Sequence, residues 1–177
     1  MENINASGNI ENNKFDIEKL ALFIQDHPDM AITGSVSFYL QTGLSLGEAI
    51  QKANDIDIFY DGNIPREIYS AARAVGNDTK IVTMIESQKK FSFKTTRENY
   101  IKKNTEYGIL RLIPIDTMVK IDLERASLFI VNKSYVYEPD DFKKLYTKLN
   151  RYLPHVEDED LKSRIRKTIS DFSVLIR

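Results

Sequence analysis

Two aspartates separated by one residue are the strongest chemical signal in this sequence. Asp55 and Asp57 lie in the segment NDIDIFY, residues 54–60, where acidic and apolar residues alternate. In an extended strand this alternation places both carboxylates on one face, about 7 Å apart, and Ile56 and Ile58 on the other. Two neighbouring carboxylates repel each other unless a cation lies between them. The pair therefore predicts a site for a hard divalent cation, Mg²⁺ or Mn²⁺.

A second signal precedes the aspartates: the segment AITGS, residues 31–35. The apolar run at 30–33 predicts a strand, and a predicted helix at 36–41 follows it almost directly. A small-residue turn between a strand and a helix presents free backbone N–H groups, which bind phosphate. Gly34 permits close approach, and Ser35 adds a hydroxyl donor. A phosphate site beside a dicarboxylate metal site predicts phosphoryl or nucleotidyl transfer.

This order of motifs resembles the nucleotidyltransferase-fold superfamily, in particular small members found in mobile elements and viruses. Such proteins carry a Gly-Gly or Gly-Ser turn after the first strand and Asp-x-Asp or Asp-x-Glu on the next, as TGSVSFYLQTG…NDIDIFY does here. The specific likeness covers residues 30–60. It implies that Gly34 and Ser35 hold the β- and γ-phosphates of an NTP, with ATP expected. It also implies that Asp55 and Asp57 bind the metals.

The resemblance further implies a third carboxylate on a neighbouring strand, which completes the metal site and activates the acceptor hydroxyl. Asp122, in KIDLERASLFI, is our candidate for both the metal and the catalytic role, followed by Asp116 and then Glu106. Periodicity here fits a helix or a strand, and we favour a short helix at 116–120 followed by a hairpin with a strand at 134–137. In a helix, Asp122 would instead be an ordinary charged surface residue.

Hydrophobic periodicity predicts the elements that must position these residues. Helices are expected at 17–26, 36–41, 45–53, 63–75, 140–152 and around Leu161, Ile165, Ile169 and Phe172. Strands are expected at 30–33, 55–60, 80–85, 90–95 and 108–115. The order predicts an α/β (α+β) fold, a mixed sheet flanked by helices with a C-terminal helical pair at about 140–177. Residues 1–14 are expected to be a disordered tail, and 15–177 a single domain.

Composition narrows the classes of function. The chain has 177 residues, a net charge of −1 and no cysteine, which excludes a thiolate metal site and a cysteine nucleophile. No apolar run approaches the length of a membrane span, so we expect a cytoplasmic protein without a membrane partner. The stretch 80–111 carries eight basic and three acidic residues. Lys52 is a candidate phosphate contact, with a surface lysine as the alternative.

We therefore expect an enzyme, a metal-dependent nucleotidyltransferase that moves an NMP from an NTP to an acceptor. The acceptor could be a small molecule, RNA or protein. One alternative is a non-catalytic binding or regulatory protein of the same fold, which the lack of an unambiguous third acid favours. A second alternative is a nucleic-acid-binding protein that uses the basic stretch 80–111.

Overall fold

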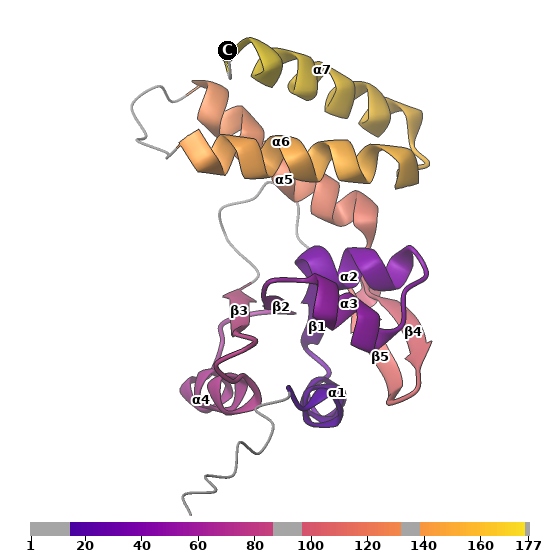
Figure 1. The fold of residues 1–177 in the computed structure, drawn as a ribbon, viewed down its shortest axis with the longest axis vertical. Helices are drawn as coiled ribbons and strands as arrows, with labels where there is room; N and C mark the ends of the chain where they lie inside the picture. Colours follow the sequence, from indigo (N-terminus) through magenta and orange to yellow (C-terminus); the bar gives the residue numbers. More distant parts are fainter. Residues whose placement is uncertain (1–14, 87–96, 132–138, 176–177) are drawn as a thin grey trace, which may run out of the picture.

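A five-stranded mixed sheet lies at the centre of the protein (Figure 1). The computed structural model describes residues 15–86, 97–131 and 139–175. The strands are β1 (Met30–Thr33), β2 (Ile56–Tyr60), β3 (Val82–Glu86), β4 (Ile101–Thr105) and β5 (Gly108–Leu112). Their order is β3-β2-β1-β5-β4, with β1–β2 and β4–β5 antiparallel and β1–β5 and β2–β3 parallel. The predicted α+β class is confirmed.

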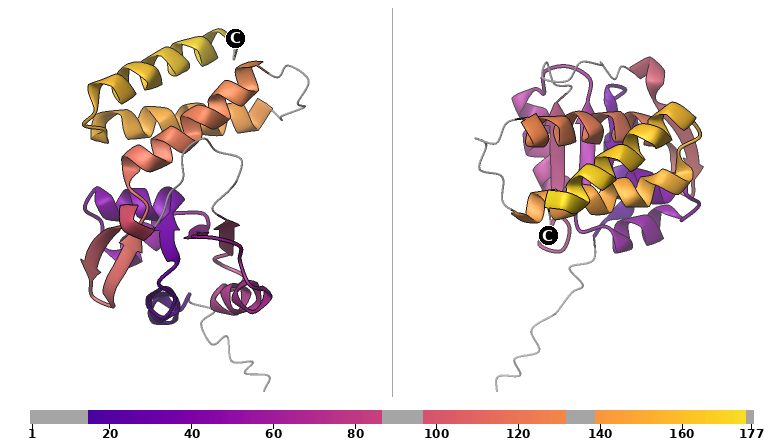
Figure 2. Two further views of the ribbon diagram at one scale, coloured as in Figure 1. Left: turned by 180° about the vertical axis from the view of Figure 1, so that it is seen from behind. Right: turned by 90° about the horizontal axis from the view of Figure 1, so that it is seen from above.

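Seven α-helices in the described residues flank the sheet: α1 (Ile17–Gln25), α2 (Gly34–Gln41), α3 (Leu46–Lys52), α4 (Arg66–Val75), α5 (Ile115–Val131), α6 (Pro139–Tyr152) and α7 (Glu159–Leu175). Two short 3₁₀ helices are η1 (Arg97–Asn99) and η2 (Leu153–His155). Seen from above, α5, α6 and α7 lie over the sheet, while α1 and α4 lie on its far side (Figures 1 and 2). The predicted C-terminal helical pair is present as α6 and α7. None of the helices described is long and apolar enough to cross a membrane.

The face of the sheet toward α1 and α4 carries a continuous apolar core. Ile32, Ile56 and Ile58 are fully buried there, together with Leu20 and Leu112. Side chains alternate between the two faces of a strand, so every second residue of β2 contributes to this core. In the segment NDIDIFY the isoleucines therefore lie on this face of the sheet, and the aspartates lie on the opposite face.

A second core lies between the opposite face and helices α5 to α7. It contains the aromatic side chains of Phe38, Phe59, Tyr152 and Phe172 together with aliphatic residues from α5, α6 and α7. The start of α5 is held against α2 by hydrogen bonds. Ser37 Oγ and Gln41 Nε2 donate to the carbonyl of Ile113 at 2.9 and 2.8 Å, and the Gln41 side-chain oxygen accepts from the Ile115 amide at 3.0 Å. These contacts fix where α5 leaves the sheet.

Two expectations about secondary structure were wrong. The predicted hairpin after residue 120 is absent from the described part of α5, which is one helix from Ile115 to Val131. Val119, Leu123 and Ala126 lie on its buried face, so the helical period was the correct one. Strand β4 was missed because its lysines obscure the alternation on an edge strand. The predicted strands at 90–95 and 134–137 and the predicted tail at 1–14 lie outside the described residues.

Candidate functional site

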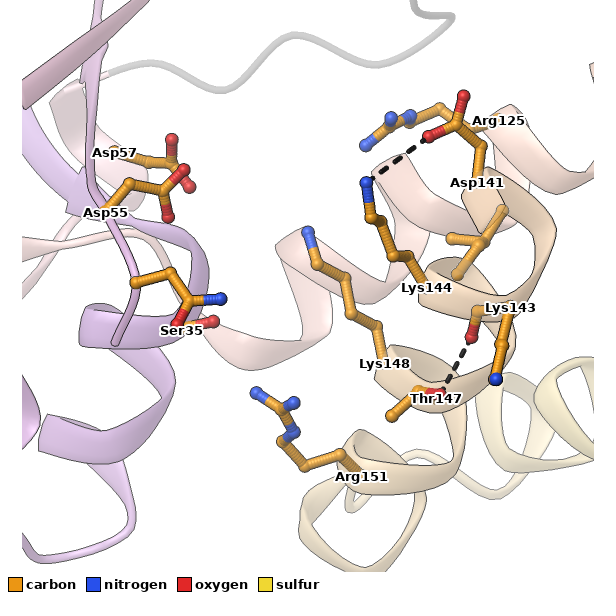
Figure 3. Close-up of a pocket in the computed structure, with 12 residues that line it drawn as sticks. Ser35, Asp55, Asp57, Arg125, Asp141, Lys143, Lys144, Thr147, Lys148 and Arg151 are labelled. Atoms are coloured by element: carbon orange, nitrogen blue, oxygen red, sulfur yellow. Dashed lines mark hydrogen bonds and ion pairs between the residues drawn. The ribbon is translucent and has the colours of Figure 1, made fainter. Parts of the chain in front are cut away.

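Asp55 and Asp57 lie on the face of the sheet toward α6, as the strand alternation predicts. Asp57 is the second residue of β2, and Asp55 immediately precedes the strand. Both side chains line a cavity of about 610 Å³ between the sheet and α6, which we call the basic cavity (Figure 3). Asp55 is exposed and Asp57 is half-buried. The two carboxylates thus stand together at the wall of one cavity.

The charge of this pair is not neutralised by the chain. Within the described ranges, neither carboxylate takes part in a hydrogen bond or an ion pair. Burial is the main cause of a raised pKa for Asp57, and repulsion by Asp55 adds to it. Lys148 and Arg125 oppose that rise without cancelling it. Two carboxylates facing open space without donors form a suitable ligand pair for a hard cation, which needs only one or two carboxylates besides substrate oxygens.

The turn between β1 and α2 lies directly beside the pair. Gly34 has a positive φ of 62°, and a Cβ at this position would overlap the carboxylate of Asp57. The absence of a side chain at Gly34 therefore lets the Asp57 carboxylate lie close to the backbone of residue 34. Thr33, the N-cap residue of α2, makes no side-chain cap hydrogen bond, and Ser35 lines the basic cavity. The first backbone N–H groups of α2 thus have no side-chain cap at the edge of the site.

The opposite wall of the basic cavity is formed by cations that the sequence analysis did not single out. Lys143, Lys144, Lys148 and Arg151 come from α6, and Arg125 comes from α5. Lys148 and Arg151 extend across the cavity toward the two aspartates and Ser35 (Figure 3). A helical signal could have found these residues, because positions 144, 148 and 151 repeat at spacings of four and three on the predicted helix.

Most of these cations have contacts that still leave them facing the cavity. Lys144 pairs with Asp141 at 3.9 Å, and Arg125 with Asp122 at 3.4 Å. The guanidinium of Arg151 lies over the rings of Phe38 and Tyr39. In the part of the chain that the structure describes, Lys148 forms no ion pair. Asp55 and Asp57 therefore face these cations across the cavity without forming an ion pair with any of them in the described residues.

A second cavity, of about 510 Å³, adjoins the first. It shares Asp55, Asp57, Arg125 and Lys148 with the basic cavity, and it also reaches Thr33 and Gly34. Beside these polar and charged residues, its walls carry five apolar or aromatic side chains from β2, β3, α5 and α6: Phe59, Ile85, Met118, Ile121 and Tyr152. Its own charged residues are Glu86 and Asp122. We call it the apolar-walled cavity.

Asp122 lies in the apolar-walled cavity, although not in the way we expected. It belongs to helix α5, not to a strand, yet it is only 4% exposed. Burial raises its pKa, and Lys148 and Arg125 oppose the rise. The helix therefore did not make it an ordinary surface residue. Among the described residues no group of three or more His, Asp or Glu side chains is placed to hold a metal ion.

The other candidate residues lie away from both cavities. Asp116 is in the first turn of α5, and Glu106 is exposed in the turn between β4 and β5. The Lys52 ammonium lies over the Tyr39 ring, 4.9 Å from its centroid, and Lys52 lines neither cavity. On β3, the strand beside β2, the residue in register with Asp57 is Thr83. The neighbouring strand thus carries no acid at that level.

The basic stretch 80–111 is partly committed to internal contacts. Lys80 Nζ donates to the Ala53 carbonyl, and Arg97 pairs with Asp29 at 3.0 Å. Arg111 donates to three backbone carbonyls around the end of α1. These three side chains are therefore held by contacts within the protein.

Comparison with known proteins supplies no family for the chain. No protein-family model matches it, and no curated protein matches its sequence.

Proposed function

We propose that the protein is a nucleotidyltransferase of the superfamily that its sequence resembles, moving an NMP from an NTP, with ATP expected, to a hydroxyl acceptor. One observation carries the proposal: an acidic pair and a basic helix face each other across a cavity without pairing. Opposite charges in proteins normally pair or neutralise each other. A metal–triphosphate fits this arrangement because it brings a cation to the acids and anions to the bases.

The chain supplies distinct groups for each part of the nucleotide. Asp55 and Asp57 would hold Mg²⁺ or Mn²⁺, which would contribute charge neutralisation at the reacting phosphate. Lys148 and Arg151 would neutralise the triphosphate from α6. The uncapped N–H groups of α2 and the Ser35 hydroxyl would donate to phosphate oxygens from the opposite wall. Such positioned charges account for most catalysis in phosphoryl transfer.

Asp122 would take the proton of the acceptor. A carboxylate whose pKa is raised by burial is a better general base than an exposed one. The acceptor oxygen would form a bond to the α-phosphorus as the bond from that phosphorus to the bridging oxygen breaks. Pyrophosphate leaves with that electron pair, and the hydroxyl proton goes to Asp122. A role of Asp122 as third metal ligand, which the resemblance implies, remains a prediction beside this one.

A second candidate is a nucleotide-binding protein without turnover. The resemblance implies a third carboxylate on a neighbouring strand, and on β3 the residue in register with Asp57 is Thr83. Such a protein would retain the basic cavity and the acidic pair. It would bind the metal–nucleotide complex but transfer nothing.

Calorimetric titration with Mn²⁺ and a non-hydrolysable ATP analogue tests the binding step. We expect binding by the wild type and its loss in Asp57→Ala. Glu67→Ala, which removes an exposed acid from the first turn of α4, is the matched control and should bind normally. Equal binding by wild type and Asp57→Ala would refute the site. Incubation with α-labelled ATP, Mn²⁺ and cell extract then separates the two candidates, since only the transferase forms a labelled product.

A further inference from the structure

The two adjoining cavities differ in character, although they share the acidic pair. The basic cavity adds four α6 side chains with basic or hydroxyl groups to the shared residues, together with Asp141 and Ser35. The apolar-walled cavity adds aromatic and aliphatic side chains, two acids, and Thr33 and Gly34 at the start of α2. Asp55 and Asp57 stand at the border between them. A molecule bound in one cavity would therefore meet a molecule bound in the other at this pair.

The geometry of phosphoryl transfer assigns a different ligand to each side. The attacking and leaving oxygens lie roughly in line on opposite sides of the phosphorus. On the proposed function, the leaving pyrophosphate lies among the cations of α6, in the basic cavity. With the α-phosphorus beside the acidic pair, the attacking oxygen approaches from the other side, which is the apolar-walled cavity. That cavity also contains Asp122, the group that would take the proton.

The lining of the apolar-walled cavity limits what can bind there. Its volume of about 510 Å³ lies in the range of small-molecule sites, about 300–1,000 Å³. Phe59 and Ile85 line it from the sheet, and Met118 and Ile121 line it from α5. Among the described residues, the only bases that reach it are Arg125 and Lys148, which it shares with the basic cavity.

Among the described lining residues, the two charged groups that the basic cavity does not share are both acidic. Asp122 is 4% exposed and contacts Arg125, while Glu86 accepts a hydrogen bond from the Ile64 amide at 3.3 Å. An acceptor that carries its own phosphates would place them against these carboxylates, where like charges repel. An uncharged or cationic molecule with an apolar face would meet no such penalty.

We propose that the apolar-walled cavity is the acceptor site and that the acceptor is a compact, phosphate-free hydroxyl compound with an apolar face. This inference rests on the proposed function and specifies its acceptor. A nucleic-acid acceptor would bring phosphates to the acidic side of the pair. A protein acceptor would have to bring a whole loop into a cavity bounded by β3, α5 and α6.

The identity of the labelled product tests the class of acceptor. The purified protein is incubated with α-labelled ATP and Mn²⁺ and, in parallel, with a low-mass ultrafiltrate, total RNA or total protein from cells. We expect label in a low-mass product whose acceptor part contains no phosphate by mass spectrometry. Label in RNA or protein would overturn this inference and leave the proposed transfer intact. No label in any fraction, with the ATP analogue still bound, would overturn the transfer and this inference with it.

Filling the cavity tests its location. Ile121→Trp on α5 should lower transfer about 100-fold by displacing the acceptor, while the Kd for the ATP analogue changes less than about twofold. Ile85→Trp fills the same cavity from β3 and should act alike if one variant folds poorly. Leu128→Trp, on the exposed side of α5, is the matched control and should change neither quantity. Should the filling variants weaken analogue binding as much as transfer, the nucleotide itself occupies this cavity and the acceptor assignment is wrong.

Discussion

The two faces of the central sheet are built from the same strands, but one face is apolar and buried while the other presents unpaired carboxylates to a cavity. Toward α1 and α4, β2 presents Ile56 and Ile58, both fully buried in an apolar core. Toward α6, it presents Asp57 and Phe59, beside two cavities. Consecutive residues of β2 therefore lie in two different environments.

The two faces of β2 therefore contribute to the stability of the protein with opposite signs. Burial of the side chains on the apolar face stabilises the folded protein, because it removes apolar surface from water. The other face holds the carboxylate of Asp57 half-buried and unpaired, which costs free energy in the unliganded protein. Substitutions on the two faces should therefore have opposite effects on stability, and the following predictions test that contrast.

The largest effect is expected from a charge on the apolar face. Ile58→Asp removes a fully buried side chain and places a carboxylate in a core without a partner. We expect a loss of about 5 kcal/mol or more in the free energy of unfolding, enough to unfold much of the protein. Urea denaturation followed by circular dichroism measures it. Ile109→Asp is the control, because Ile109 on β5 is 52% exposed and its replacement should cost little.

A smaller loss is expected at the boundary between the faces, at Gly34. Gly34→Ala forces a Cβ into a residue with positive φ and against the Asp57 carboxylate. The backbone strain costs about 1–2 kcal/mol, and the overlap adds to it and displaces Asp57 from the site. Gly34→Ala in an Asp57→Ala background is the matched control, because it keeps the positive φ and removes the overlap with the carboxylate.

The comparison of the two backgrounds isolates the overlap. By denaturation in urea, Gly34→Ala should lower the free energy of unfolding more in the wild type than in the Asp57→Ala background. In the second background the overlap with the carboxylate is gone, and only the strain of the positive φ remains. If Gly34→Ala has the same cost in both backgrounds, a Cβ at residue 34 does not clash with the acidic pair.

Charge removal from α6 should affect binding more than folding. Lys148→Ala should weaken binding of the ATP analogue about tenfold, or about 1.4 kcal/mol, because Lys148 extends into the basic cavity without an ion pair among the described residues. Its melting temperature should stay close to that of the wild type. Lys120→Ala removes an exposed lysine outside both cavities and should leave binding unchanged. Unchanged affinity in Lys148→Ala would exclude the basic cavity as the phosphate site.

The smallest effect is a gain in stability at Asp57. Its pKa is raised in the folded state, so the folded protein binds that proton more tightly than the unfolded chain does. The stability that this group contributes is therefore fully present below pH 3.8, the ordinary pKa of an aspartate, and is lost as the pH rises through the raised pKa of Asp57. Asp57→Asn, which cannot ionise, should melt a few degrees higher than the wild type at pH 7, and the gain should shrink toward pH 4.

Asp55→Asn serves as the comparison for this gain. It removes only the repulsion from Asp55, the second cause of the raised pKa, and leaves the burial of Asp57 unchanged. Its melting temperature should rise less than that of Asp57→Asn. Calorimetric scans of both variants across the pH range measure the difference, and a lower melting temperature for Asp57→Asn at pH 7 would contradict the assignment of an unneutralised charge.

The acidic pair and the turn before α2 could be predicted because their geometry is local. A two-residue period determines the face on which Asp57 lies, and the order of strand, turn and helix places Gly34 beside a helix N-terminus. The long helix α5 was missed because a short apolar run fits both periods, and only packing against α6 and α7 decides between them. Asp122 is buried for the same non-local reason.

The basic wall could be predicted as a helix face but not as part of a site. Lys148 and Arg151 share a face of a helix that was correctly expected near residues 140–152. Their proximity to Asp57 depends on how α6 crosses the sheet, which follows from side-chain packing in the second core. No local sequence pattern predicts that residues so far apart in the sequence lie close together in space.

That distance along the chain has a consequence for biosynthesis. Asp55 and Asp57 precede α6 in the chain, so the acidic pair is synthesised before the cations that face it, and α6 leaves the ribosome after the whole sheet. The strands and the apolar core against α1 and α4 can assemble before the basic wall exists. During that interval the nascent chain carries an acidic pair with no counter-charge from α6. The cavity between the sheet and α6 is therefore complete only after α6 has been synthesised.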